Sequence, residues 1–189
     1  MGRATVARFP AGLAFARPAA IGSPGMALDA APVLIAYDGS EVSRAAVQRA
    51  ADLFAGRPAV LATVWEPGLA MVTGLSMGSA DMAMGTLPPD PATVEAVDRG
   101  QREHASTVAA DGAEFARSLG LKAEPHAVPD EVNVADTLID IAQARGAAVV
   151  VVGSHGISGI RKRLLGSVSR KLIEHCDRPV LVIRDDSSP

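Results

Sequence analysis

The sequence predicts an α/β fold in which helices cover both faces of a parallel β-sheet. Short aliphatic and β-branched runs alternate along the chain with segments of helical periodicity, which is typical of parallel strands joined by crossover helices. The run Ala147–Val152 ends in four consecutive valines and is bounded by glycine, which indicates a strand buried on both faces. Because crossovers between parallel strands are right-handed, few topologies remain, and the fold class is a Rossmann-like three-layer α/β/α arrangement.

The first half of the chain carries the signals of two strands and two helices. Strands are expected over Val33–Tyr37 and Ala59–Val64. Between them, Ser43–Ala55 is amphipathic, with apolar residues on or near one helical face. A longer helix is expected over Val94–Leu119, and Gly120 is expected to stop it, because glycine readily adopts the conformation that ends helices.

The second half continues the alternation. A strand over Leu121–Val128 is interrupted by Pro125, so it is expected at a sheet edge, where a missing N–H is tolerated. Asn133 is expected to cap a helix that runs through Ala144, with Asp136 in its first turn. The remaining elements are the strand at 147–152, a helix from Ser169 to His175 or Cys176, and a strand over Val180–Ile183.

The composition excludes several classes of function. The chain of 189 residues is 48% hydrophobic but only 3% aromatic, so its core must be aliphatic. A net charge of -3 argues against a general nucleic-acid binder, which usually has a basic face. The single cysteine, Cys176, excludes an intramolecular disulfide framework and a multi-cysteine metal site, and it fits a reducing cytoplasm. No stretch approaches the roughly 20 apolar residues of a membrane span.

Two segments lack a periodic apolar pattern. Residues 1–30 contain several prolines and glycines, and we expect a disordered extension there; the alternatives are an ordered extension, a targeting signal, or a true start at Met26. Residues 67–93 are rich in Gly, Met, Ser and Pro, and a loop of this length is either functional or disordered. We expect this loop to be mobile.

The most informative motif directly follows the run of valines. It reads Gly153-Ser154-His155-Gly156, then nine residues, then Gly166-Ser167. Glycines after a buried strand let the backbone turn tightly and approach a ligand, and the free N–H groups of the following helix start suit an anion. Strand, loop and helix start together predict a phosphate cradle. The motif is neither a P-loop nor a dinucleotide fingerprint, because it lacks Gly-Lys-Ser/Thr and Gly-x-Gly-x-x-Gly.

This Gly-x2-Gly-x9-Gly-Ser pattern resembles the nucleotide-binding signature of the universal stress protein family. Three further pieces resemble that family in the same order: the first strand with its Asp-Gly-Ser turn at Pro32–Glu41, the alanine-rich first helix at Ala45–Ala55, and the last strand at Arg178–Arg184. The resemblance covers about residues 31–185, and we expect one domain over 31–186. One departure is the turn at 128–132, which lacks the glycine usual in the family.

The resemblance implies a sheet order of 3-2-1-4-5, with a ligand crevice between strands one and four at the carboxyl ends of the strands. It implies binding of ATP or AMP in a stress-response role. In the family, the position of Val64 meets adenine through its main chain. The implied nucleotide-binding residues are Asp38, Val64, Gly153, Ser154, Gly156, Gly166, Ser167, Val168 and Ser169. Asp38 is also expected to bind Mg²⁺ or Mn²⁺ bridging to the phosphates, since these cations prefer oxygen ligands.

The resemblance also implies a homodimer joined through strand five, because an edge strand offers unpaired backbone groups to a second copy. No nucleic-acid or membrane partner is expected, and the expected location is the cytoplasm. No general base is evident, so any ATP hydrolysis should be slow. The alternatives are a nucleotide-dependent enzyme of the adenine-nucleotide α/β group, and an interaction module with a vestigial nucleotide site.

Several of these residues have an alternative local role. Asp38 suits an Asx turn with the Gly39 and Ser40 that follow it, and Gly153 and Gly156 suit simple turns. Ser167 suits a plain helix cap. His155 favours a solvent-facing position over a phosphate contact. The basic run at 161–163 is equally consistent with attraction of a polyphosphate and with a solvated loop.

Overall fold

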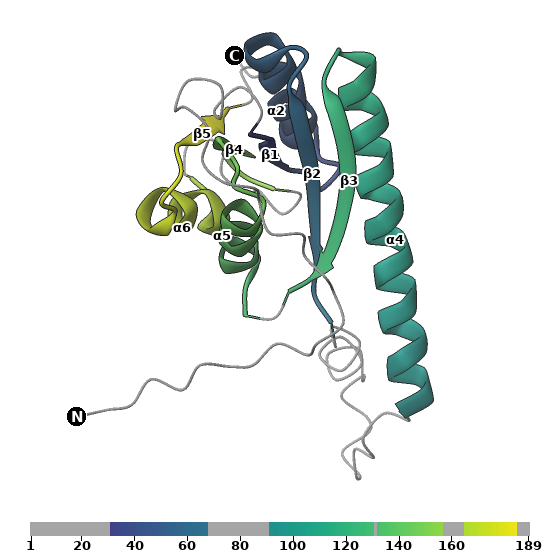
Figure 1. The fold of residues 1–189 in the computed structure, drawn as a ribbon. Coiled ribbons are helices and arrows are strands. Elements are labelled where there is room, and N and C mark those ends of the chain that lie inside the picture. The colour runs from purple at the N-terminus through teal and green to yellow at the C-terminus, as the bar shows by residue number, and fades with distance from the viewer. Residues whose placement is uncertain (1–30, 68–90, 131, 157–164, 185–189) are drawn as a thin grey trace, which may run out of the picture.

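The computed structural model describes residues 31–67, 91–130, 132–156 and 165–184 (Figure 1). Within these ranges the chain forms five strands and four helices in strict alternation. The strands are β1 (Val33–Ala36), β2 (Pro58–Trp65), β3 (Lys122–Pro129), β4 (Val149–Gly153) and β5 (Val180–Ile183), and the helices are α2 (Glu41–Phe54), α4 (Pro91–Ser118), α5 (Val134–Ala144) and α6 (Ser167–His175). All of these were predicted as elements of the correct type.

The strands form one parallel sheet of order β3-β2-β1-β4-β5, as expected. The chain moves outward from β1 to β3 on one side and then returns to β4 and β5 on the other. The strand order therefore reverses between β1 and β4, where Val33 pairs with Val149 and Ile35 with Val151. This reversal is the topological switch point of an open α/β sheet.

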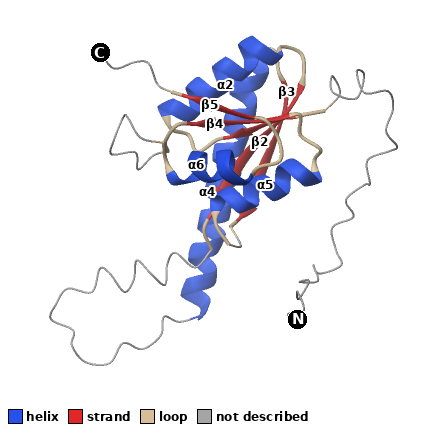
Figure 2. Cartoon of the chain, turned by 90° about the vertical axis from the view of Figure 1, so that its left-hand side faces the viewer, coloured by secondary structure: helices blue, strands red, loops and turns tan. Residues whose placement is uncertain are grey.

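Helices cover both faces of the sheet (Figure 2). On one face, α2 and α4 pack on side chains such as Ile35 and Leu61, and on the other face α5 and α6 pack on alternate residues such as Leu34 and Val150. The alternation follows from the two-residue period of a strand, and β4 is buried along its whole length. The core consists mainly of Ala, Val, Leu and Ile, as the composition predicted.

The two edges of the sheet differ. β3 pairs only with β2, and Pro125 lies in it opposite Leu61, which confirms the predicted edge position. β5 pairs only with β4 and carries no charged side chain. The described helices include none that is both long enough and apolar enough to cross a membrane.

Several predicted boundaries were wrong. The helix predicted from Val94 begins at Pro91, so residues 91–93 are helical and do not belong to the expected loop; proline suits the first helical turn because the N–H there is unpaired in any case. The last helix begins at Ser167 rather than Ser169. Gly120 adopts φ +93° after α4 and stops it, as expected. The expected extension at 1–30 and most of the expected mobile loop, residues 68–90, lie outside the described residues.

Candidate functional site

A cavity of about 320 Å³ opens at the carboxyl ends of β1, β2 and β4. Its position is the one expected for a ligand site at a switch point. One side is formed by the loop after β4 and the first turn of α6, and the other by aliphatic side chains of β2 and α5. We call these the loop side and the apolar side. The lining residues are Ala36, Tyr37, Asp38, Ser43, Ala62, Val64, Val134, Leu138, Val152, Gly153, His155, Gly156, Gly166, Ser167, Val168 and Ser169.

The loop side is held together by hydrogen bonds to the carbonyl oxygen of Ser154. This oxygen accepts the N–H of Gly166 at 2.7 Å and the hydroxyl of Ser169 at 3.1 Å. The N–H of Ser154 donates to the carbonyl of Ile183 in β5 at 2.7 Å. The end of β4, the start of α6 and the end of β5 are therefore held together at one residue.

The first turn of α6 faces the cavity with few local partners. Gly166 is the N-cap residue and has no side chain to accept a hydrogen bond from the turn. The alternative role of Ser167 as the helix cap is therefore wrong, because Ser167 is the first helical residue. Its side chain is exposed and has no hydrogen bond within the described part of the chain. The N–H groups of a helix start and this hydroxyl are donors suited to an anion.

The glycines of the loop are required by close packing. Neither Gly153 nor Gly156 has a positive φ, so no left-handed conformation demands them. A Cβ on Gly153 would lie 2.8 Å from Val42 Cγ1 and 3.2 Å from the His155 carbonyl oxygen. A Cβ on Gly156 would lie 2.8 Å from Asp38 Oδ2. Gly153 therefore lets the strand end pack on α2, and Gly156 lets the loop approach the carboxylate of Asp38.

Asp38 forms the local turn that its sequence context suggested. Its Oδ1 accepts the N–H of Ser40 at 3.0 Å and the hydroxyl of Ser40 at 2.6 Å. Ser40 in turn caps α2, where its hydroxyl oxygen accepts the N–H of Ser43. Because Asp38 also lines the cavity, the turn fixes the direction of a carboxylate at the boundary between the loop side and the apolar side.

The apolar side consists of side chains that are far apart in the sequence. Val64 lies near the end of β2, and Val134 and Leu138 lie four residues apart in the first turns of α5. Ala36, Ala62 and Val152 contribute from three neighbouring strands. This surface is aliphatic, which suits contact with an aromatic ring.

Most of the predicted site residues meet at this cavity. Eight of the nine line it: Asp38, Val64, Gly153, Gly156, Gly166, Ser167, Val168 and Ser169. Ser154 does not; it is buried, and its hydroxyl lies 3.0 Å from His155 Nδ1. The hydroxyl of Ser169 donates to the carbonyls of Ser154 and Gly166, so it holds the loop together. His155 is half-buried and lines the cavity, contrary to the solvent-facing position that the sequence favoured.

Val134 and Leu138 line the cavity but were not predicted to do so from the sequence. A signal was present, because a helix that follows a parallel strand begins at the carboxyl edge of the sheet, where the crevice lies. Tyr37 and Ser43 were also missed, although they flank the turn of Asp38. The residues of the basic run at 161–163 lie outside the described ranges.

Two pKa shifts fall next to the cavity or on the edge strand. A hydrogen bond from Lys171, followed in size by one from Asn133, lowers the pKa of Asp136 at the start of α5. Burial, together with the charge of Arg145, lowers the pKa of His126 on β3, which favours its neutral form. In the described ranges, no three His, Cys, Asp or Glu side chains are grouped closely enough to form a metal centre.

An open parallel sheet with a cavity at its switch point defines a class of α/β proteins that bind ligands at this edge. Residues 31–184 match the sequence model of the Universal stress protein family. The chain therefore belongs to the universal stress protein family, in agreement with the resemblance of its loop motif.

Individual relatives agree with this assignment. The chain is 28% identical over 152 residues to Universal stress protein YxiE of Bacillus subtilis, which covers 80% of this chain and 97% of that protein. It is 31% identical over 159 residues to Universal stress protein Rv2623 of Mycobacterium tuberculosis, which covers 82% of this chain and 48% of that protein. The chain thus spans about half the length of the second relative.

Solved structures share the fold. The structure of protein MJ0577 of Methanocaldococcus jannaschii has a TM-score of 0.65 at 19% identity, covering 85% of this chain and 99% of that chain. A universal stress protein of Archaeoglobus fulgidus in complex with dAMP has a TM-score of 0.54 at 19% identity and covers 82% of this chain and 99% of that chain. A family member from Arabidopsis thaliana with AMP bound has a TM-score of 0.50 at 13% identity, and the match covers 83% of this chain and 93% of that chain. At such identities these structures show the fold alone.

Proposed function

We propose that this chain binds AMP or ATP in the cavity and acts as a regulatory stress-response protein rather than as an enzyme. The observation that carries the proposal is that one cavity joins an aliphatic surface to a glycine loop and a helix start. A nucleotide has the matching polarity, with an aromatic base at one end and phosphate at the other. The cavity volume of about 320 Å³ lies at the lower end of the range of small-molecule sites, roughly 300–1,000 Å³.

The loop side is proposed to hold the phosphates. Gly156 and Gly166 let the backbone come close to the ligand, and the first N–H groups of α6 point to an anion. Ser167 adds a hydroxyl with no competing partner in the described residues. Val168 and Ser169 lie in the same first turn of α6, and their role is proposed to come from the backbone N–H groups of that turn. Gly153 and Ser154 act indirectly, because they shape the loop through Val42 and Gly166.

The apolar side is proposed to hold the base. Val64 is expected to meet adenine through its main chain, as the family resemblance implies, while Val134 and Leu138 cover the ring from α5. Asp38 is oriented by Ser40, and its position between the two sides suits hydrogen bonds from the sugar hydroxyls. Complexes of family members with dAMP and AMP support an adenine nucleotide as the ligand.

Mg²⁺ or Mn²⁺ is proposed to accompany ATP. Asp38 is the carboxylate that lines the cavity, and Mg²⁺ commonly uses one or two carboxylates together with phosphate oxygens and water. The donor set therefore fits a cation that depends on the nucleotide for most of its ligands. Such a cation would neutralise phosphate charge beside Asp38.

A regulatory role is proposed over catalysis because the motif around the cavity supplies no evident general base for hydrolysis. We further propose a cytoplasmic homodimer joined through β5, whose outer edge is unpaired within the described residues and carries no charge.

Mass spectrometry of the natively purified protein tests the proposal, followed by calorimetric titration with AMP, ATP, GMP and inorganic phosphate. Co-purified adenine nucleotide, or saturable binding of AMP or ATP stronger than that of GMP, is the expected result. Binding without base preference would point to a general anion site. Absence of any binding would favour an interaction module with a vestigial site, and rapid ATP turnover would favour an enzyme.

A further inference from the structure

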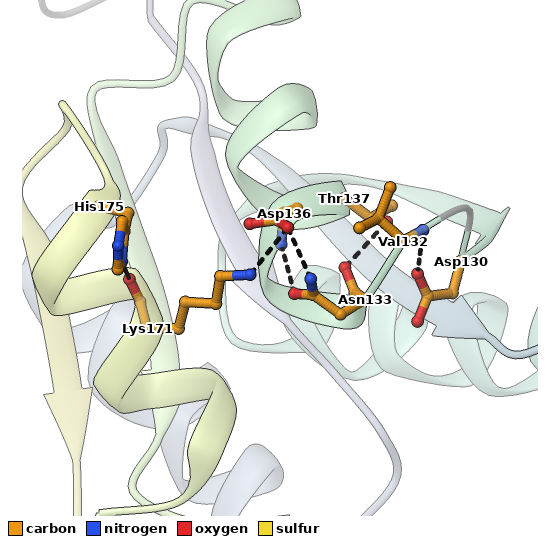
Figure 3. A network of polar contacts seen from close by, with 7 residues as sticks. All are labelled: Asp130, Val132, Asn133, Asp136, Thr137, Lys171 and His175. Carbon is orange, nitrogen blue, oxygen red and sulfur yellow. Dashed lines mark hydrogen bonds and ion pairs between the residues drawn. The ribbon is translucent and has the colours of Figure 1, made fainter.

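Helices α5 and α6, which both contribute to the cavity, are joined by an ion pair. Lys171 Nζ in α6 lies 2.8 Å from Asp136 Oδ2 in α5, and each side chain is about 35% exposed (Figure 3). Within the described ranges, no other ion pair connects α5 to α6. The two helices are also held together by apolar contacts, because Leu172 of α6 is buried in the same core cluster as Leu138 and Ile139 of α5.

The ammonium of Lys171 is connected to the whole first turn of α5. Asp136 Oδ2 also accepts a hydrogen bond from Asn133 Nδ2 at 2.6 Å, and Asn133 Oδ1 accepts the N–H of Asp136 at 3.1 Å (Figure 3). Asn133 is the N-cap of α5. The position of Lys171 therefore affects the helix cap and the backbone that carries Val134.

The pair lies beside the residues that line the cavity. Lys171 follows Ser167 by four positions and Val168 by three, so it shares their side of α6. Asp136 lies two residues from both Val134 and Leu138, so it projects from another side of α5 than these two lining residues. The ion pair therefore joins the first turn of α5 to α6 beside the cavity.

We propose that Lys171 and Asp136 are positioning residues for the nucleoside part of the ligand, because their ion pair sets the separation of α5 and α6 across the cavity. This inference rests on the adenine-nucleotide function proposed above. The base is proposed to lie against Val134 and Leu138, so its binding depends on where the first turns of α5 are held. The phosphates depend on the loop and the start of α6 alone, and Lys171 does not serve them while it is bound to Asp136.

The energetics favour an effect on the site over an effect on folding. Exposed or half-exposed ion pairs add little to global stability. The hydrogen bonds that Asp136 accepts lower its pKa, so it remains ionised at neutral pH and the pair persists. A weak contact of this kind changes the local position of a helix end more than the stability of the core.

Lys171→Met and Asp136→Asn test the proposal by calorimetric titration of the full chain with adenosine, AMP and inorganic pyrophosphate. We expect each variant to weaken binding of adenosine and AMP by about threefold to fivefold, the range available to a half-exposed pair. Pyrophosphate binding should stay unchanged. Lys171→Arg should restore wild-type binding, and the double variant should be no weaker than either single variant, because both remove the same interaction.

Arg170→Met is the matched control. It removes a positive charge from the neighbouring position of α6, where the exposed side chain forms no ion pair within the described residues. Adenosine affinity should not change in this variant. Equal adenosine affinity in wild type and Lys171→Met would overturn the inference, and so would a loss of pyrophosphate binding as large as the loss of adenosine binding.

Amide hydrogen exchange of the nucleotide-free protein separates this inference from the proposed function. Lys171→Met and Asp136→Asn should speed exchange in the first turns of α5, at 134–138, and leave α2 unaffected. If the wild-type chain binds neither adenosine nor AMP, the proposed function fails, and the exchange rates still decide whether the pair holds α5. Unchanged exchange in α5 would show that the pair does not position the helix.

Discussion

The two sides of the cavity are built in different ways. The loop side is made largely by backbone from one short stretch around β4 and α6, with glycines that admit close contact. The apolar side is made by side chains from β1, β2, β4 and α5, whose positions depend on the assembled sheet. Gly153 and Gly156 of the loop side therefore leave almost no room for added atoms, whereas the apolar side tolerates changes of shape and responds gradually. Substitutions on the two sides should differ in size and in the part of the ligand that they affect.

Gly156→Val should have the largest effect. Even a Cβ at this position would lie 2.8 Å from Asp38 Oδ2, so the larger side chain must displace the carboxylate from the cavity. Overpacking of about 1–3 kcal/mol and loss of a charged hydrogen bond of about 1.5–3 kcal/mol together predict a loss of AMP affinity of about 60-fold or more. Calorimetry measures the affinity, and circular dichroism checks the fold.

Gly166→Ala is the control for this glycine. Its Cβ would approach the nearest atoms only to 3.4 Å, and its φ of -64° is accessible to alanine. We expect a much smaller loss than for Gly156→Val. Equal losses at the two glycines would contradict the role of the Asp38 contact.

Ser167→Ala should have the next largest effect. The hydroxyl is exposed at the first position of α6, and its removal should eliminate one charge-assisted hydrogen bond to phosphate, worth about 1.5–3 kcal/mol. The expected loss of ATP affinity is about 10-fold to 100-fold, while adenosine affinity should be unchanged. Because the hydroxyl does not cap the helix, the melting temperature should also be unchanged. Equal ATP affinity in wild type and variant would reject the phosphate role.

Val134→Ala changes the apolar side and should have a smaller effect. The side chain is half-buried in the first turn of α5, so its truncation removes contact with the base without opening the core. Loss of about 0.7–1.4 kcal/mol of apolar contact predicts about a threefold to tenfold weaker affinity for both AMP and adenosine. Inorganic phosphate binding should not change. If phosphate binding falls as much as adenosine binding, the two sides do not act separately.

The loop side was predictable from the sequence and most of the apolar side was not, for the same physical reason. Gly153, Gly156, Gly166 and Ser167 lie within one stretch, and their residue types reflect local backbone requirements. Val134 and Leu138 look like ordinary core residues of an amphipathic helix, and only the fold brings them opposite α6. The strand and helix types followed from periodicity, whereas boundaries such as Pro91 depend on packing that the pattern does not contain.

The packing role of Gly153 illustrates a further limit. The motif identified a glycine at the end of β4, but Val42 of α2 and the carbonyl of His155 are what exclude a side chain there. A contact between two distant elements leaves no trace in local sequence spacing. The ion pair of Lys171 and Asp136 is a similar case, because each residue looks like a solvated charge on its own helix.

Val182→Lys should have the smallest effect on binding, although it is expected to change the oligomeric state. Val182 lies in β5, the unpaired edge, and a charge there should oppose pairing with a second copy across a two-fold axis. In the described residues β5 meets the loop side through its backbone pairing with β4 and through the bond from the Ser154 N–H to the Ile183 carbonyl, and the substitution removes neither. Light scattering at micromolar concentration should show a wild-type dimer and a Val182→Lys monomer, and AMP affinity should agree within about twofold, because neither side of the cavity includes the edge. The β3 edge provides the control: Lys122→Glu should leave the dimer intact, since β3 already contains Pro125, Pro129 and the charged residues Lys122 and Glu124, which discourage pairing. A wild-type monomer would end the dimer proposal, and a monomeric variant with strongly reduced AMP affinity would mean that the loop side depends on the second copy.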